Sequence, residues 1–448
     1  TVMQRRAFAL IFLMLFCSLL VIMMGHHAWA QEEQKALNLD DLLSIAMEKN
    51  PQIIAARERT NQASARLEQA AAGLAPKLDL SANYSKSEGG LTDNPFDETY
   101  EVAVNLTHLL YSGGSMEAQV ESAKLELEAS KADELRTIQM VDNGVRVSYY
   151  DLQRARSRLN VALEALALAK EHLNEVEALH RNGVVAINEV LRVQVDVSSA
   201  ELERISAANA VDVALAALEK AIGVSLPKGI TMPQPEAEAE VPPFHLPEDP
   251  QMEALKLRPE LKSLESLRMS AQALARSAAG QARPQIYIQG SGGMIDTNLL
   301  PEEDEWRVDL LFQWRLYDRR EIESRVMEAK SMAQELLHRI SDMENQVKLE
   351  VSQASLSLAS ALQRVNVSQD QVRLAEEDYR MALRRYQTQV GTNIDVLDAR
   401  VAYIDASNAL VNSIYDAYTA YSNLLFAMGA TGMEFASIDA NTEEGKIQ

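Results

Sequence analysis

The chain has 448 residues, 65 acidic against 43 basic side chains, and a formal net charge of −22. This acidic excess argues against nucleic acid as a partner, because phosphate binding requires clustered Lys and Arg. The single cysteine, Cys17, excludes an internal disulfide and a thiolate metal site.

Residues 1–30 have the layout of a secretory signal. Arg5 and Arg6 precede an apolar run over residues 7–24, and Ala28-Trp29-Ala30 has the small residues of a cleavage site. We expect cleavage after Ala30, which removes two arginines and changes the net charge from −22 to −24. An uncleaved anchor is the alternative, since the apolar run is nearly long enough to span a bilayer.

The remaining sequence contains two copies of one unit. Asn50-Pro51 recurs as Arg258-Pro259 at an offset of 208, and Leu110-Tyr111 recurs as Leu316-Tyr317 at an offset of 206, which then holds to the end of the unit. We predict a first repeat over residues 31–226, a proline-rich acidic linker over 227–250, a second repeat over 251–430 and a tail over 431–448.

Each copy is predicted to begin with short helices, followed by a pair of strands at about 77–110 and 285–316. Apolar residues alternate with polar ones there, as at Val308, Leu310 and Phe312, which predicts strands with one apolar face. Trp306 and Trp314 lie on this face and would mark the two girdles of a membrane barrel. A soluble sandwich is the alternative. Since four strands cannot close a membrane barrel, a barrel would require several chains.

Each copy is predicted to end in long helices. No proline occurs in residues 96–226 or 302–448, and one helix is expected from about Gly114 to Gly183. Large and small side chains alternate at steps of three and four, at Leu159, Ala162, Leu166, Ala169, Leu173, Val176 and His180. This spacing favours helices packed side by side in a bundle or curved wall. No apolar run after residue 30 is long enough for a membrane-spanning helix.

These features resemble the TolC family of outer-membrane efflux proteins. The resemblance rests on LDDLLSIAMEKNPQI, LLYSGG, NGVVAINEVLRVQVDV and VGTNIDVLDARVAYIDASNAL, in this order and spacing. It implies a mainly α protein with a β-barrel part: a homotrimer whose chains each give four strands to a 12-stranded outer-membrane barrel, continued into the periplasm by a long α-helical barrel. The implied function is a passive exit duct for drugs, metals or proteins in a tripartite efflux or type I secretion system of a Gram-negative cell.

The resemblance also implies the partners. These are a periplasmic adaptor (a membrane fusion protein), an inner-membrane RND or ABC pump that supplies the energy, and outer-membrane lipid around the barrel. We expect no cofactor, no metal and no enzyme activity, because the sequence offers no set of nucleophile, base and orienting residue. A soluble periplasmic coiled-coil scaffold without a pore is the alternative from another class.

In family terms, the long helices reverse at a periplasmic tip. We expect glycines with positive φ at both reversals and adaptor contact through the turn residues, which are Gly183, Val184, Val185, Gly391 and Thr392. The resemblance assigns Asp395 and Asp398 to acidic rings at the pore entrance, where carboxylates attract cations. The alternative is that Asp395 and Asp398 are simply acidic residues on a solvent-exposed helix surface.

The resemblance further assigns a latch that closes the tip, formed by Tyr386 with Asn188 and Glu189. A tyrosine hydroxyl that donates to a carboxylate suits a latch because no charge is stranded when it opens. The sequence departs from the family where Gln389 replaces a usual glycine and Gly391 aligns with a basic latch residue. Either Arg385 substitutes for that residue or the entrance is less tightly closed.

Overall fold

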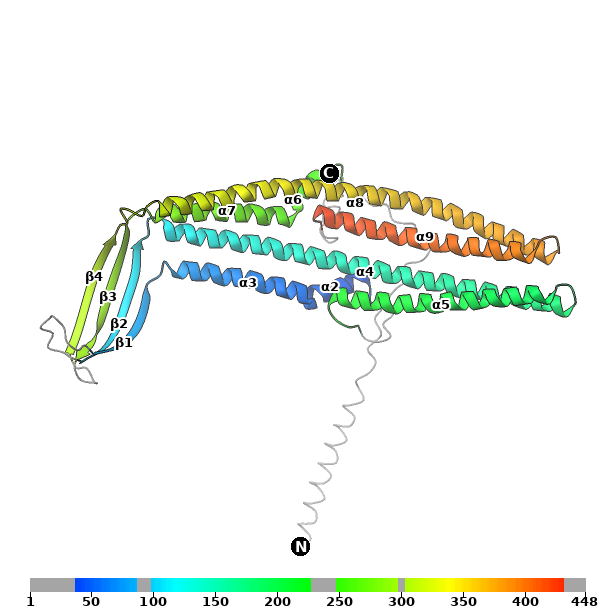
Figure 1. Cartoon of the computed structure of the whole chain (residues 1–448), viewed down its shortest axis with the longest axis horizontal. Helices are drawn as coiled ribbons and strands as arrows, with labels where there is room; N and C mark the ends of the chain where they lie inside the picture. The colour runs from blue at the N-terminus through cyan, green and yellow to red at the C-terminus, as the bar shows by residue number, and fades with distance from the viewer. Residues whose placement is uncertain (1–36, 87–97, 227–246, 297–302, 431–448) are drawn as a thin grey trace, which may run out of the picture.

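The computed structural model describes residues 37–86, 98–226, 247–296 and 303–430 of an elongated molecule. A small sheet lies at one end, and long helices run from it to two hairpin tips at the other (Figure 1). The predicted signal, most of the predicted linker and the predicted tail lie outside the described residues.

The elements occur in the same order in both halves, which confirms the two repeats. The first half contains α2 (Leu39–Lys49), α3 (Pro51–Ala72), β1 (Lys77–Lys86), β2 (Glu98–Tyr111), α4 (Ser115–Arg181) and α5 (Ile187–Ile222). The second half contains α6 (Pro250–Leu257), α7 (Pro259–Gly280), β3 (Gln285–Asp296), β4 (Glu303–Gln313), α8 (Glu321–Gln387) and α9 (Asn393–Met428). The pairs α4–α5 and α8–α9 are called the first and second hairpin.

Equivalent side chains tie each hairpin to the short helices of its own repeat. Asn50, which caps α3, donates from Nδ2 to the carbonyl of Ala221 near the end of α5, at 2.8 Å. Arg258, at the equivalent cap of α7, donates from Nε to the carbonyl of Ala427 near the end of α9, also at 2.8 Å. Both contacts satisfy a carbonyl that has no partner inside its own helix.

The four strands form one antiparallel sheet in the order β1-β2-β3-β4, as the alternating pattern predicted. Leu80 pairs with Val104, which pairs with Gly292, which pairs with Trp306, so these positions share one face. This apolar face is open to solvent in the single chain: Leu80 is 76% exposed and Trp306 is 79% exposed. The next register positions, Asp79, Asn105, Ser291 and Arg307, place polar side chains on the opposite face.

The predicted end of the fourth strand differs from the structure. β4 ends at Gln313, so Trp314 lies just beyond the strand, and its indole Nε1 donates to the carbonyl of Ala282 at 3.0 Å. The alternation continues to Leu316 in the sequence, but it marks a strand only where a neighbouring backbone supplies ladder hydrogen bonds, and the pairing with β3 stops at Gln313.

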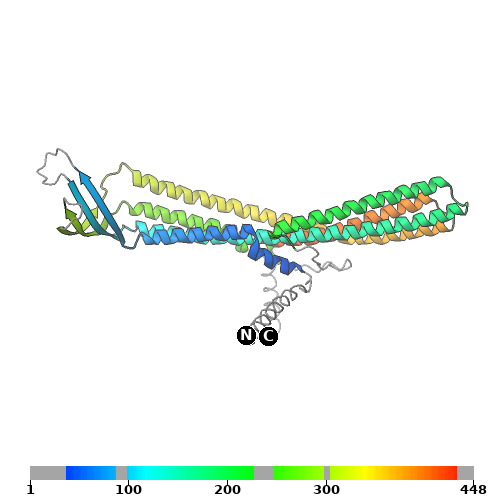
Figure 2. The ribbon, with the colours of Figure 1, turned by 90° about the horizontal axis from the view of Figure 1, so that it is seen from below.

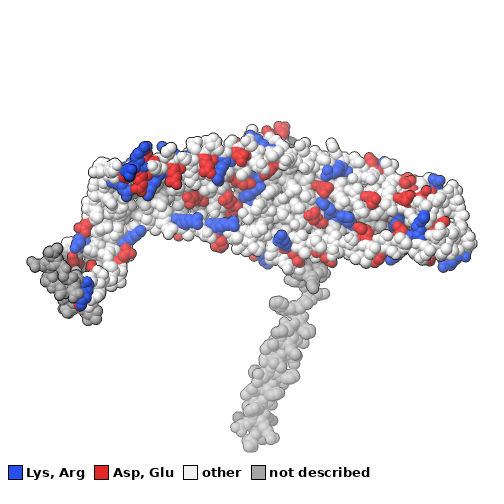
Figure 3. All heavy atoms as spheres, in the orientation of Figure 1, with Lys and Arg blue, Asp and Glu red and all other residues white. Residues whose placement is uncertain are grey.

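The helical part has a thin core drawn out along its length. Every residue of the predicted seam in α4 is buried or half-buried, and small clusters of apolar side chains lie between α4 and α5 and between α8 and α9. The two hairpins meet where α4 packs against α9 (Figures 1 and 2). On the face seen in Figure 3, acidic and basic side chains are mixed along the helices. Within the described ranges, no helix has the length and apolar character needed to cross a bilayer.

Candidate functional site at the hairpin tips

Both hairpins reverse through the same hydrogen-bonded turn. In the first, the amide of Val184 donates to the carbonyl of Leu179 at 2.9 Å; in the second, the amide of Val390 donates to the carbonyl of Arg385 at 2.9 Å. This arrangement closes the end of a helix and requires a left-handed residue just before the donating amide. The two turns are related by the repeat offset of 206.

The prediction of positive φ is confirmed at Gly183 and wrong at Gly391. Gly183 has φ of 74°, whereas the left-handed residue of the second turn is Gln389, with φ of 63°. Gly391 is needed for a different reason: a Cβ there would lie 3.0 Å from the Arg385 Cβ and 3.2 Å from the backbone nitrogen of Tyr386. The sequence pattern was misleading because the glycine of the second turn, Gly391, is required for close packing. The position that adopts positive φ lies two residues earlier and is occupied by Gln389.

Asp395 and Asp398 lie on the first turns of α9 and line one hollow with Asp378 and Arg385 of α8. The Asp395 carboxylate accepts the amide of Thr392 at 2.9 Å, and the Thr392 hydroxyl accepts the amide of Asp395 at 3.2 Å. This capping box starts the helix. The hydrogen bond from the Thr392 amide, helped by Arg385, lowers the pKa of Asp395, so its carboxylate is charged at neutral pH. Asp398 is exposed.

Tyr386 and Glu189 are brought together across the hairpins. The Tyr386 hydroxyl donates to the Glu189 Oε2 at 3.4 Å, a long hydrogen bond. Burial raises the pKa of the Tyr386 hydroxyl to about 12, and the nearby Glu189 adds to the shift. Asn188 is exposed, and among the described residues its side chain makes no hydrogen bond to the second hairpin.

A buried histidine adds a contact that sequence analysis missed. The His172 Nε2 of α4 lies 2.7 Å from the Asn393 Oδ1 of α9, and the imidazole packs edge-on against the Tyr386 ring at 5.4 Å. The His172 side chain is only 1% exposed. Its spacing places it next to the predicted seam of α4, which was the one available signal.

Two further contacts between the hairpins lie deeper in the bundle. Arg400 of α9 forms an ion pair with Asp196 of α5, and the Tyr403 hydroxyl of α9 donates to Glu164 of α4 at 3.1 Å. Arg400 is the only basic residue in α9, which also contains four aspartates. Sequence analysis did not single out Arg400, although an isolated basic residue within an apolar and acidic helix is a signal that could have indicated a buried partner.

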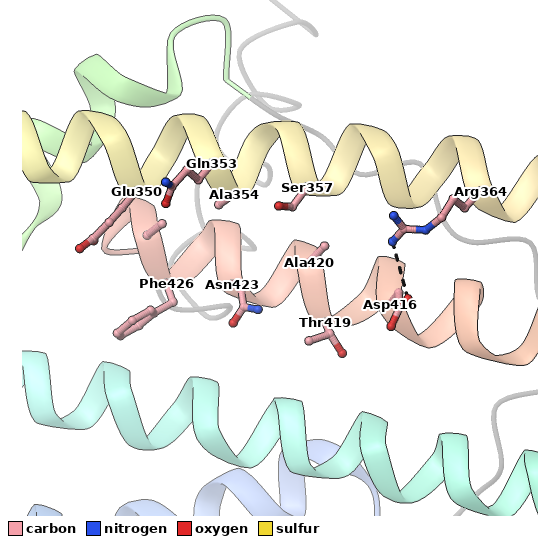
Figure 4. A pocket seen from close by; sticks show the side chains of 11 residues that line it. Glu350, Gln353, Ala354, Ser357, Arg364, Asp416, Thr419, Ala420, Asn423 and Phe426 are labelled. Carbon is pink, nitrogen blue, oxygen red and sulfur yellow. Dashed lines mark ion pairs between the residues drawn. The ribbon is translucent and has the colours of Figure 1, made fainter. Parts of the chain in front are cut away.

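A second hollow lies at mid-length between α8 and α9 (Figure 4). It has a volume of about 490 Å³ and is lined by Glu350, Ser357, Asn423 and Phe426, among others. Arg364 and Asp416 face each other across it at 3.6 Å. Asp416 is also held by Arg154 of α4 at 3.1 Å, so the charges in this hollow are already matched within the protein.

Fold and site together define a class: two-repeat proteins in which long helical hairpins end, at one pole, in a sheet with an exposed apolar face. A model of the outer membrane efflux protein family matches residues 42–224 and 252–430. The chain therefore belongs to the outer membrane efflux protein family, as the sequence resemblance predicted. It is an outer-membrane efflux channel protein that extends into the periplasm, and these findings do not support the soluble scaffold.

Several solved structures of outer membrane proteins have the same fold as this chain. The chain is similar to the outer membrane protein VceC of Vibrio cholerae (22% identity, TM-score 0.75, covering 88% of this chain and 96% of VceC). It is also similar to the CmeC outer membrane channel of Campylobacter jejuni (20% identity, TM-score 0.76, covering 90% of this chain and 90% of CmeC). A further similar structure is the open state of the MtrE outer membrane channel of Neisseria gonorrhoeae (20% identity, TM-score 0.77, covering 88% of this chain and 89% of MtrE). No curated protein matches the chain by sequence.

Proposed function

We propose that three copies of the chain assemble into one passive exit duct across the outer membrane and the periplasm. The observation that carries this proposal is the sheet: its apolar face is exposed, and β1 and β4 are edge strands. In lipid, unpaired strand edges are costly because no water satisfies their backbone groups. Pairing β1 of one copy with β4 of the next removes every edge and closes a barrel of 12 strands.

In this assembly the apolar face meets lipid and the polar face lines the lumen. Trp306, within β4, and Trp314, just beyond it, would lie at the two membrane–water interfaces, where tryptophan is favoured. An exposed large apolar surface on a soluble protein is otherwise a liability for aggregation. Contact with lipid would therefore explain why Leu80 and Trp306 are exposed on the single chain.

At the other pole, Asp395 and Asp398 would form acidic rings around the threefold axis of the entrance. Three charged carboxylates at one level attract cations and repel one another, which favours an open or hydrated mouth. The contact between Tyr386 and Glu189 would close the entrance by holding the hairpins together. Its length of 3.4 Å indicates a latch that opens readily.

The tips also offer a surface for a periplasmic adaptor. Val184 is 47% exposed and Val390 is 71% exposed, and both flank the turns predicted to make this contact, with Gly183, Val185, Gly391 and Thr392 beside them. Exposed apolar side chains at a tip mark a docking surface for a partner with apolar side chains of its own. Through that adaptor, an inner-membrane RND or ABC pump would drive drugs, metals or proteins into the duct, which itself acts without catalysis or cofactor.

The test is ion conduction by the detergent-purified mature protein in a planar bilayer. We expect discrete, cation-selective current steps, and a loss of cation selectivity when Asp395→Asn and Asp398→Asn are combined. Asparagine is chosen because its side-chain oxygen still accepts the amide of Thr392, so the helix cap is kept while the charge is removed. A chain that stays soluble without detergent and conducts no current would refute the proposal.

A further inference from the structure

A polar hollow lies where the sheet meets the long helices, at the far end of the molecule from the tips (Figure 1). It has a volume of about 220 Å³ and is called the junction hollow. Two arginines and four glutamines contribute to its lining: Arg283, Arg315, Gln119, Gln281, Gln285 and Gln313. Gln313 stands an even number of residues from Arg307 along β4, so the junction hollow lies on the polar face of the sheet.

The hydrogen bonds around the junction hollow leave donors unused. The Tyr287 hydroxyl donates to the Gln285 Oε1 at 2.7 Å, and Arg325 donates to the Gln281 Oε1 at 3.2 Å. Both amide oxygens are therefore engaged, and the Nε2 groups of these glutamines, which only donate, remain available. Arg283 uses one of its five N–H groups on the carbonyl of Gly113, at 3.1 Å. The lining is therefore suited to a ligand that accepts hydrogen bonds.

The charge at the junction hollow is positive, although the whole chain has a net charge of −22. Among the described residues that line it, two are arginine and none is acidic. Glu321 lies 3.4 Å from Arg315, but Arg325 holds that carboxylate more closely, at 2.7 Å. At the next level of the same face, Lys77 and Asp309 have opposite charges and cancel. An anion is therefore the ligand that this site favours.

The fold itself does not require the two arginines. The repeat offset of 208 relates Arg283 to Ala75, and the offset of 206 relates Arg315 to Leu109. The first repeat thus builds the same junction between a strand pair and a long helix without either charge. Both arginines are particular to the second repeat, and the shared architecture gives no reason for them.

We propose that the junction hollow binds a carboxylate or phosphate group of an anionic transported molecule. A guanidinium donates two parallel hydrogen bonds to such a group, and the Nε2 groups of Gln281 and Gln285 add further donors. The volume admits the group with part of its water, since one water takes about 30 Å³.

The proposal rests on the proposed function, in which the polar face of the sheet lines the lumen of the duct. Three copies would place three junction hollows around that lumen. An acidic wall repels anions, whereas arginines at one level attract them. The junction hollow would therefore give an anionic molecule a favourable position at the base of the barrel, far from the acidic entrance.

Binding is tested with inorganic phosphate as the probe, followed by phosphorus NMR line width on the detergent-purified mature protein. We expect saturable broadening that acetate reverses by competition. Arg315→Gln should weaken the affinity about tenfold or more, because hydrogen bonds from a charged donor are lost. Gln285→Glu keeps an oxygen for Tyr287 but replaces a donor by a negative charge, so it should abolish binding. Arg307→Gln, on the same face but paired with Glu305, is the matched control and should bind as the wild type does.

The results separate this site from the duct as a whole. No saturable binding, or binding unchanged in Arg315→Gln and Gln285→Glu proteins that assemble normally on gel filtration, would overturn the site. In planar bilayers, phosphate should reduce the current steps of the wild type but not those of Gln285→Glu. Binding without any effect on the wild-type current would overturn its place in the transport path. Absence of wild-type current steps would overturn the proposed function, whereas the binding measurement does not depend on them.

Discussion

The left-handed residue of the second tip turn allows a direct measurement of backbone strain. Gln389 has φ of 63°, and its counterpart in the first turn is Gly183, with φ of 74°. A non-glycine residue in this conformation is roughly 1–2 kcal/mol less stable than in the right-handed one. Glycine avoids that strain but loses roughly 0.5–1 kcal/mol more conformational entropy on folding. We therefore expect Gln389→Gly to stabilise the second turn by about 0.5–1 kcal/mol.

Hydrogen exchange at the turn amides reports this difference locally. The Val390 amide is protected by its 2.9 Å hydrogen bond to the carbonyl of Arg385, so its exchange follows opening of the turn. A gain of about 0.5–1 kcal/mol slows exchange about two- to fivefold. The reciprocal change, Gly183→Ala, should accelerate exchange at Val184 to a similar extent, because a Cβ at Gly183 meets no atom within 4 Å and only the conformational cost remains.

The two variants must move in opposite directions. Unchanged or faster exchange at Val390 in a correctly assembled Gln389→Gly protein would refute the reasoning. It would mean that packing around the second turn, and not the conformational preference of the residue, decides its stability.

Three further predictions concern the hairpin contact, the sheet and the junction of the repeats. Burial raises the pKa values of Tyr386 and Tyr403 to about 12; since a free tyrosine titrates near 10, their stabilising contribution is present below about pH 10 and is lost as the pH rises toward 12. The melting temperature should decrease between about pH 10 and pH 12, and it should decrease less when Tyr386→Phe and Tyr403→Phe are combined. An equal decrease in both proteins would show that these two hydroxyls do not cause the pH dependence. Gly293→Ala places a Cβ 2.2 Å from a β2 carbonyl oxygen and should reduce the yield of folded protein, whereas Gly292→Ala, with no atom within 4 Å, should not; equal yields on gel filtration would contradict this. Arg258→Met removes the ion pairs with Glu260 and Glu350 and the hydrogen bond to the carbonyl of Ala427, while Glu260 keeps its ion pair with Arg136. The unfolding free energy should fall by roughly 1–3 kcal/mol in denaturant titrations; an unchanged midpoint would show that water replaces these contacts at no cost.

The tip turns show how far sequence alone leads. The offset of 206 pairs Gly183 with Gln389, and the structure gives both the same left-handed backbone. The same relation holds at the start of the long helices, where Gly113 and Gly114 have positive φ and their counterparts Arg319 and Arg320 keep it. Glycine therefore located these turns in the first repeat but not in the second, because the surrounding packing imposes the turn even where the residue disfavours it.

The candidate site was predictable only in part. Tyr386 and Glu189 were paired correctly in space because a family resemblance connected them, whereas Asn188 lies apart from the contact. The pair of Arg400 with Asp196 was missed because its members stand 204 residues apart, and the two motifs that contain them do not show that they meet. Local periodicity contains no information on which charges meet across two hairpins.

The sequence by itself determined the duplication, the long helices and the four alternating strands of this protein. These features depend on interactions within one turn or one strand, where side-chain spacing and the absence of proline decide the backbone. The tertiary structure alone decided that β4 ends at Gln313, that Gln389 adopts a left-handed conformation and that Arg400 is buried against Asp196. Each of these depends on contacts between segments far apart in the chain, and such contacts exist only once the hairpins and the sheet have packed.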